Sequence, residues 1–253
     1  MTKLLNPMYW ARALSHPLVL VGLFIDLLPI YGVIVWGWNA VPLVMLYWME
    51  NVIAGVMTIP RLVISGASYG GFGLLAGMGL SIFFVFHYGL FCLVHGTFLV
   101  AFASIGNPEG MGSMPFADIF GIFQFGLNSG LHVDWMIYII ATFQVLVFFW
   151  EFIIKGEWKH TNPMAEMFAP YSRIILLHFG IFAGAAALFL LGQPMVGVLA
   201  LILFRAAYGI VSNSKRFGME AGLDAAANKL GGREAFEKLM KGQDPNAPPP
   251  ANP

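Results

Sequence analysis

The sequence has little charge, since Asp, Glu, Lys and Arg make up only 10% of its 253 residues. A soluble domain typically carries about 25% charged residues, because a surface that faces water needs them. The chain is also 58% hydrophobic, so it lacks the polar side chains to cover itself in water. Lipid is the solvent that suits this composition, and we expect an integral membrane protein whose first partner is the bilayer.

Cysteine, net charge and the common catalytic motifs are also scarce or missing. Cys92 is the one cysteine, which excludes an intrachain disulfide framework and argues against a thiolate zinc site. The formal net charge is zero, so we expect no nucleic-acid partner. The sequence contains no HExxH zincin motif, no P-loop and no dinucleotide-binding fingerprint. Each of these absences excludes a familiar class of enzyme.

Long apolar runs are what the chain has in abundance. A helix needs about 20 apolar residues to cross the hydrocarbon core, where nothing else can hydrogen-bond its backbone. Six runs meet this need, at 17–37, 41–64, 79–103, 135–155, 170–192 and 195–213. The first is longer than a signal-peptide core and no clear cleavage site follows it, so we expect it to stay as a span. We assign the Gly-rich stretch 65–78 to a connection and helix start.

The basic residues test these spans independently, since Lys and Arg collect in the loops on the cytoplasmic side. The loops at 38–40, 104–134 and 193–194 contain no Lys or Arg. Twelve of the thirteen basic residues fall at the opposite ends of the runs, and Arg205 lies within the sixth. We therefore predict an all-α, six-helix transmembrane bundle with both termini in the cytoplasm. This orientation suits a multi-pass protein of a bacterial inner membrane.

The chain divides into a transmembrane domain, 1–213, and a polar cytoplasmic tail, 214–253, with a Pro-rich end that we expect to be disordered. The third loop contains a Phe-rich segment, 115–127, which predicts a short helix lying at the outer interface. A lid over an outward-facing site is the alternative. Gly73/Gly77 and Gly180/Gly184 match the small-xxx-small pattern of close helix contact.

Ionisable residues inside the spans are the most informative feature, because burying a charge in hydrocarbon costs a few kcal/mol. The set comprises Asp26, Glu50, His87, His95, Glu151, His178 and Arg205. Each has a structural explanation. Glu151 and Lys155 have the spacing of a helical ion pair, Arg205 is placed to neutralise Glu50 or Asp26, and a neutral histidine is satisfied by a carbonyl. Three histidines and two deep carboxylates together nevertheless exceed what packing needs.

Depth along the helices, at about 1.5 Å per residue, sorts these residues into two layers. Glu50 and His95 lie about 12–13 Å from the outer ends of their spans, whereas Asp26, His87 and His178 lie about 12–14 Å from the inner ends. His87 and His95 are about 12 Å apart, too far for one ion. The candidate polar cluster is Asp26, Glu50, Asn51, His87, His95, His178 and Arg205. The candidate ligands of a divalent metal are Glu50, His95, His87 and His178, and facing His87 and His178 would also suit haem.

Two strings carry a family resemblance, YWMEN at 47–51 and FHYGLFCLVHGTF at 86–98. They resemble a family of prokaryotic polytopic membrane proteins described only as a domain of unknown function. The shared pattern is Tyr-Trp-x-Glu-Asn, followed on the next span by His-Tyr-Gly-x-Phe-x-x-x-His-Gly-x-Phe. The resemblance covers the second and third spans directly and implies no activity. It draws attention to Glu50, Asn51, His87 and His95.

Three classes of function fit these observations. The first is a non-catalytic subunit or scaffold, with a membrane-protein partner or a second copy of the chain. The second is a metal-dependent membrane enzyme, in which the Glu and His residues bind an ion that activates water. The third is a proton-coupled transporter or channel, in which these residues pass protons along a polar path. We expect no rhomboid-type serine protease, because neither Ser65 nor Ser129 lies inside a predicted span.

Overall fold

The computed structural model describes residues 17–106 and 117–172, and single residues at 174, 175, 178, 179, 182, 190, 202, 203, 206 and 209. Every regular element in this part of the chain is a helix. The elements are α2 (Pro17–Trp36), α3 (Ala40–Ala67), α4 (Gly70–Gly106), α5 (Ile119–Leu127), α6 (Val133–Val147), η2 (Phe148–Ile154), η3 (Glu157–Lys159) and α7 (Pro163–Phe168). The prediction of an all-α protein is confirmed for these residues.

The chain forms two compact units. One comprises residues 25–205 and contains all the contacts discussed below. The other comprises residues 1–24 and 206–253, of which the structure describes the first turns of α2 together with Ala206 and Gly209. The polar tail predicted at 214–253 lies outside the described residues.

Three helices among the described residues are long and apolar enough to cross a membrane: Ala40–Ala67, Gly70–Ala101 and Val133–Ile154. A shorter apolar helix covers Leu20–Val35. These four match the spans predicted at 17–37, 41–64, 79–103 and 135–155. The spans predicted at 170–192 and 195–213 fall mostly outside the described residues, so the count of six and the cytoplasmic termini stay predictions.

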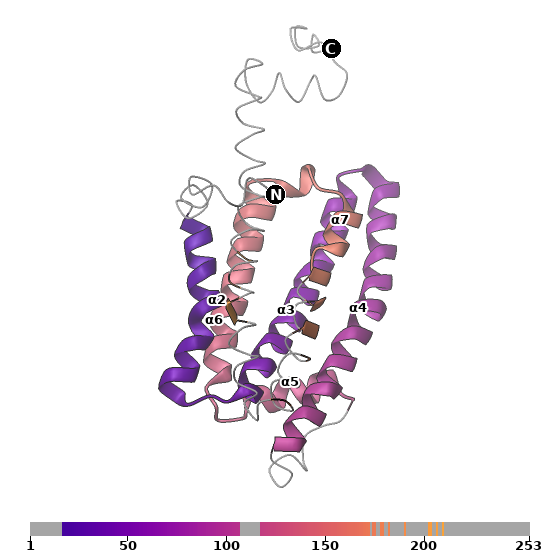
Figure 1. The fold of residues 1–253 in the computed structure, drawn as a ribbon. Coiled ribbons are helices and arrows are strands. Elements are labelled where there is room, and N and C mark those ends of the chain that lie inside the picture. Colours follow the sequence, from indigo (N-terminus) through magenta and orange to yellow (C-terminus); the bar gives the residue numbers. More distant parts are fainter. Residues whose placement is uncertain are drawn as a thin grey trace, which may run out of the picture. The chain divides into compact units, whose positions relative to one another are not determined.

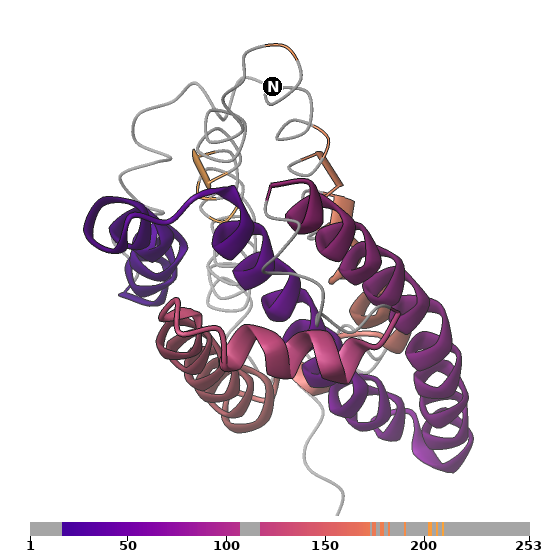
Figure 2. The ribbon, with the colours of Figure 1, turned by 90° about the horizontal axis from the view of Figure 1, so that it is seen from below.

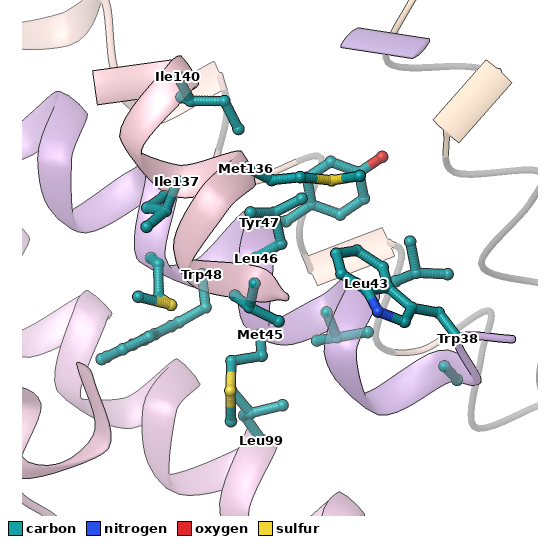
Figure 3. Close-up of a cluster of buried hydrophobic side chains, with 14 of the residues drawn as sticks. Trp38, Leu43, Met45, Leu46, Tyr47, Trp48, Leu99, Met136, Ile137 and Ile140 are labelled. Carbon is teal, nitrogen blue, oxygen red and sulfur yellow. The ribbon is translucent and has the colours of Figure 1, made fainter. Parts of the chain in front are cut away.

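Helix α3 is the central span of the larger unit. Of its most apolar window 72% is buried inside the protein, against 28% for each of the other two spans. It is also the least hydropathic of the three, because it carries Glu50, Asn51, Thr58 and Arg61. Polar side chains are costly against lipid, so the helix that holds them lies where other helices cover it. Figure 3 shows part of this core, with Leu46 and Tyr47 of α3 facing Met136 and Ile137 of α6.

Helices α3 and α4 form a tight antiparallel hairpin, which corrects the connection assigned to 65–78 (Figure 1). Only Ser68 and Tyr69 separate them, and α4 begins at Gly70. The glycines serve helix packing, as Gly73/Gly77 predicted. A Cβ on Gly77 would lie 2.6 Å from the carbonyl oxygen of Leu62 and 3.2 Å from Cα of Gly66. The two backbones therefore touch, which only glycine permits.

Helix α5 confirms the helix predicted in the third loop, although residues 107–116 before it are not among those described. Asp118 caps it, accepting a hydrogen bond from the Phe120 N–H at 3.0 Å. Figure 2 shows α5 lying across one end of α3 and α6. Ile122 and Gly126 are buried against Trp48, Met45 and Met49 of α3, whereas Phe120 is 83% exposed. One face of α5 thus closes the end of the bundle, and its place at a membrane interface stays a prediction.

The end of α6 changes to a π-helix, η2, which faces Arg61 of α3. The wider turn is seen in the bond from the Lys155 N–H to the Trp150 carbonyl, five residues back. It places Phe148 and Phe152 with their rings 5.7 Å and 4.7 Å from the Arg61 guanidinium carbon. Glu166 of α7 and Glu157 of η3 pair with the same guanidinium at 3.3 Å and 3.9 Å.

These contacts fix the relative directions of the spans. Arg61 packs against η2 at one end, and Tyr47 lies beside Met136 at the other, so α3 and α6 run parallel while α4 runs antiparallel to both. The distribution of basic residues predicted the same alternation. The predicted ion pair is also present, because Lys155 Nζ lies 2.9 Å from Glu151 Oε1.

Candidate histidine site

The structure brings His95 of α4 against His178. His95 Nε2 lies 2.8 Å from His178 Nδ1, and the two rings are nearly perpendicular with centroids 4.1 Å apart. His95 is 2% exposed and His178 is half-buried. The two residues are 83 positions apart in the sequence, so this contact joins separate segments inside the larger unit. We call it the His95–His178 pair.

Backbone carbonyls determine which ring nitrogens carry protons. His95 Nδ1 lies 2.5 Å from the Phe91 carbonyl oxygen, and His178 Nδ1 lies 3.3 Å from the Ile174 carbonyl oxygen. A carbonyl only accepts hydrogen bonds, so each Nδ1 must carry a hydrogen. His95 Nε2 is then an acceptor, and it receives the His178 Nδ1–H, which the Ile174 carbonyl shares. His178 Nε2 keeps the one ring lone pair that these bonds do not use.

A repeated spacing underlies the contact. Tyr88 and His95 are seven residues apart, as are Tyr171 and His178, and in each case the histidine bonds the carbonyl four residues before it. The rings of Tyr88 and Tyr171 also meet, edge to face, with centroids 5.6 Å apart. The two segments therefore run parallel, tyrosine against tyrosine and histidine against histidine. This Tyr-x6-His repeat is the signal in the sequence that identifies the partner of His95.

The pairing of histidines differs from the one that depth predicts, in which His87 faces His178. His87 Nδ1 lies 2.6 Å from the Tyr171 hydroxyl, and His178 bonds His95 instead. The reason is depth, because α4 begins at Gly70 and not at 79, and with Tyr88 against Tyr171 it is His95 that lies level with His178. Rotation about α4 also separates His87 from His95 by about 80°. His95 is consequently buried while His87 is exposed. The facing arrangement of His87 and His178 that would suit haem is not the one described.

Glu50 and Asn51 of α3 lie level with the stretch of α4 between His87 and His95. Both are 4% exposed. Trp48 fixes this level by donating its indole N–H to the Cys92 carbonyl at 2.8 Å, and the Tyr88 hydroxyl donates to the Asn51 carbonyl at 3.1 Å. A buried carboxyl group thus lies between the levels of His87 and His95.

Two members of the predicted cluster lie elsewhere or outside the described residues. Asp26 is partly buried on α2, and Arg205 is not among the residues that the structure describes. The described part of the chain contains no group of three His, Cys, Asp or Glu side chains placed to hold a metal ion. The metal set Glu50, His95, His87 and His178 therefore stays a hypothesis without geometric support.

Sequence reasoning misses the Arg61 cluster and the role of Tyr171. The sequence places Arg61 only at the cytoplasmic end of a span, yet it joins α3 to η2, η3 and α7. Thr161 adds to this cluster by donating its hydroxyl to Glu166 Oε1 at 2.8 Å. The position of Tyr171 near the end of a span is typical of an interfacial aromatic, yet its ring contacts His87, Tyr88 and Phe91.

Comparison with known proteins yields one match. The model of a family described as "Family of unknown function (DUF6498)" covers residues 8–230 of the chain. No curated protein and no solved structure matches the chain.

Proposed function

Because the chain belongs to DUF6498, a family of unknown function, we propose a role from its own residues: a multi-pass membrane protein that acts as a proton-coupled transporter or channel. The observation that carries this proposal is the bond between His95 Nε2 and His178 Nδ1 at 2.8 Å. Histidine is the side chain whose ordinary titration falls nearest neutral pH. Two linked imidazoles between apolar helices form a proton-binding group in a region that contains few other groups able to bind protons.

The hydrogen-bond pattern gives the pair two distinct protonation steps. A first proton binds the lone pair of His178 Nε2, which no hydrogen bond among the described residues uses, and leaves the bonds to Phe91, to Ile174 and between the two rings intact. A second proton must bind His95 Nε2, which would then be a donor facing another donor. That step breaks the bond between the two segments, so proton binding is coupled to helix contact.

A buried carboxyl group extends this polar path. Glu50 is 4% exposed and lies on α3, level with the stretch of α4 between His87 and His95. Intramembrane acid and histidine residues commonly form the proton relays of pumps and transporters. A scaffold needs the same interhelical bond but not its capacity to take up a proton, and this difference separates the two functions experimentally.

Two substitutions keep the bond, and each removes one of the two proton-binding nitrogens. In His95→Gln the amide oxygen accepts from His178 Nδ1–H, and in His178→Asn the amide N–H donates to His95 Nε2. We expect the free energy of unfolding of both variants to lie within about 1 kcal/mol of the wild-type value, because the interhelical hydrogen bond is retained. We expect both to lose proton flux, measured as acidification of a trapped pH dye in proteoliposomes under a potassium diffusion potential.

The controls separate transport from structure. Proteoliposomes of the wild type should acidify faster than protein-free vesicles, and both conservative variants should match the protein-free rate. His95→Leu, which also removes the acceptor, should unfold more easily by about 1 kcal/mol. Wild-type flux in His95→Gln and His178→Asn would contradict the proposal and favour a scaffold role.

A further inference from the structure

His87 is an exposed histidine deep inside a membrane span. The span Gly70–Ala101 is centred between residues 85 and 86, which puts His87 about 2 Å from its middle. If the bilayer instead covers 79–103, the offset is about 6 Å. The hydrocarbon core reaches about 15 Å to either side of its midplane. His87 therefore faces the interior of the bilayer in either registration, independently of the His95–His178 pair.

The hydrogen bonding of His87 leaves one polar atom to be satisfied from outside. The phenol of Tyr171 is the more acidic group, so it donates its O–H to His87 Nδ1 across 2.6 Å. The imidazole then carries its proton on Nε2. No residue in the described part of the chain accepts a hydrogen bond from Nε2. A donor without an acceptor is costly in hydrocarbon, where water is absent.

Depth restricts what supplies the acceptor. Phospholipid headgroups and their ester carbonyls lie at the edge of the core, about 9 Å or more from His87 along the membrane normal. The acceptor must belong to a molecule that dissolves in the core itself. A carbonyl attached to an apolar body has this chemistry.

Aromatic rings surround His87, and two of them are exposed. Phe83, 51% exposed, stacks on the imidazole with an interplanar angle of 16° and centroids 5.1 Å apart. Phe91 meets the imidazole edge to face. Phe168, 59% exposed, extends the same surface on the far side of Tyr171. Offset stacking on such faces favours a planar conjugated ring over an aliphatic chain.

We propose that His87, Tyr171, Phe83 and Phe168 form a lateral binding site, open to the bilayer, for a lipid-soluble molecule of the quinone class. A ring carbonyl of the ligand accepts the His87 Nε2–H. The ring packs against the exposed rings of Phe83 and Phe168, and the apolar tail stays among the lipid chains. Tyr171 positions the imidazole by holding Nδ1, so that Nε2–H points to the ligand.

Photolabelling tests this site with the full chain in phospholipid nanodiscs. The probe is an azido-ubiquinone with a short tail, and labelled residues are mapped by mass spectrometry. We expect the label in segments 83–91 and 168–171, with competition by excess decylubiquinone. His87→Phe keeps a ring but removes the N–H, so labelling there should fall about tenfold, the loss of one ordinary hydrogen bond. Tyr171→Phe should cause a smaller fall.

The matched control is Phe98→Leu, an exposed position of the same helix that should leave labelling unchanged. Labelling spread evenly over the exposed face of α4, unaffected by competitor and by His87→Phe, would overturn the site. The same conclusion follows if a Leu90→Cys, Cys92→Ala variant forms disulfide-linked dimers in liposomes, because a second copy would then cover this face.

Discussion

Replacing Gly77 by leucine is expected to force α3 and α4 apart and to lower the free energy of unfolding by about 3 kcal/mol or more. A Cβ at this position would lie 2.6 Å from the Leu62 carbonyl oxygen, which is backbone and cannot rotate away. The two helices meet through Gly66, Gly73 and Gly77, so a side chain at 77 disrupts the whole contact. The measurement is SDS-induced unfolding of the purified protein, followed by circular dichroism.

A neighbouring glycine supplies the control with the opposite sign. A Cβ on Gly79 would meet no atom within 4 Å, although this glycine is on the same helix two residues away. Alanine is a better helix former than glycine, so Gly79→Ala should raise stability by about 0.5–1 kcal/mol. Gly77→Ala should lower it by about 1–3 kcal/mol. Equal effects at the two positions would show that α3 and α4 do not touch as described.

Trp48→Ala is expected to lower the free energy of unfolding by about 3 kcal/mol. The side chain is 1% exposed, lies against Gly96 and packs near Phe123 of α5. Its removal leaves a cavity where α3, α4 and α5 meet and deletes the bond to the Cys92 carbonyl. We choose the low end of the range for tryptophan, because between lipid and protein interior the transfer of apolar atoms contributes little.

Two variants divide this effect into its parts, in the same unfolding assay. Trp48→Phe fills most of the cavity but lacks the indole N–H. It should lower the free energy of unfolding by about 1 kcal/mol, the contribution of one hydrogen bond. Trp135→Ala removes the same side chain from a position that is 64% exposed, and its effect should stay within about 0.5 kcal/mol. A loss at Trp135 as large as the loss at Trp48 would contradict the burial described.

The helical spans could be predicted from the sequence because the solvent imposes them. Any segment that crosses hydrocarbon must satisfy its own backbone, so an apolar run of about 20 residues predicts a helix almost regardless of its detailed sequence. The alternation of direction followed from the basic residues for the same general reason. Helices α2, α3 and α6 with η2 match their predicted positions closely, and α4 contains its predicted span but begins nine residues earlier.

The prediction for the connection between α3 and α4 was wrong, because glycine has two opposite uses. A run such as SGASYGGFGLLAGM is typical of a loop in water, where glycine loosens the chain. In a membrane the same residue allows two helices to touch. Both helices therefore continue up to a turn of only two residues. The π-helix η2 was missed as well, because nothing in FFWEFII distinguishes it from an α-helix until Arg61 is placed beside it.

The members of the candidate site were foreseeable, but their partners were not. The free-energy cost of placing an ionisable side chain in hydrocarbon singles out His87, His95 and Glu50, whatever the direction of their side chains. Depth counted from the predicted span ends pairs His87 with His178, but α4 begins at Gly70 and not at 79, so the depth of His87 was underestimated. The Tyr-x6-His repeat carries the missing information, because it aligns Tyr88 with Tyr171 and His95 with His178. Two sites result, one buried and one open to the bilayer.

The most direct test of this account is the tautomeric state of His95 and His178 in bilayers. Nitrogen-15 NMR of histidine-labelled protein, assigned with His95→Gln and His178→Asn, reports which ring nitrogen of each residue carries the hydrogen. The account predicts Nδ1–H in both residues, with a scalar coupling across the bond from His178 Nδ1 to His95 Nε2. Two Nε2–H tautomers without that coupling would contradict the pair and the proton-binding role built on it.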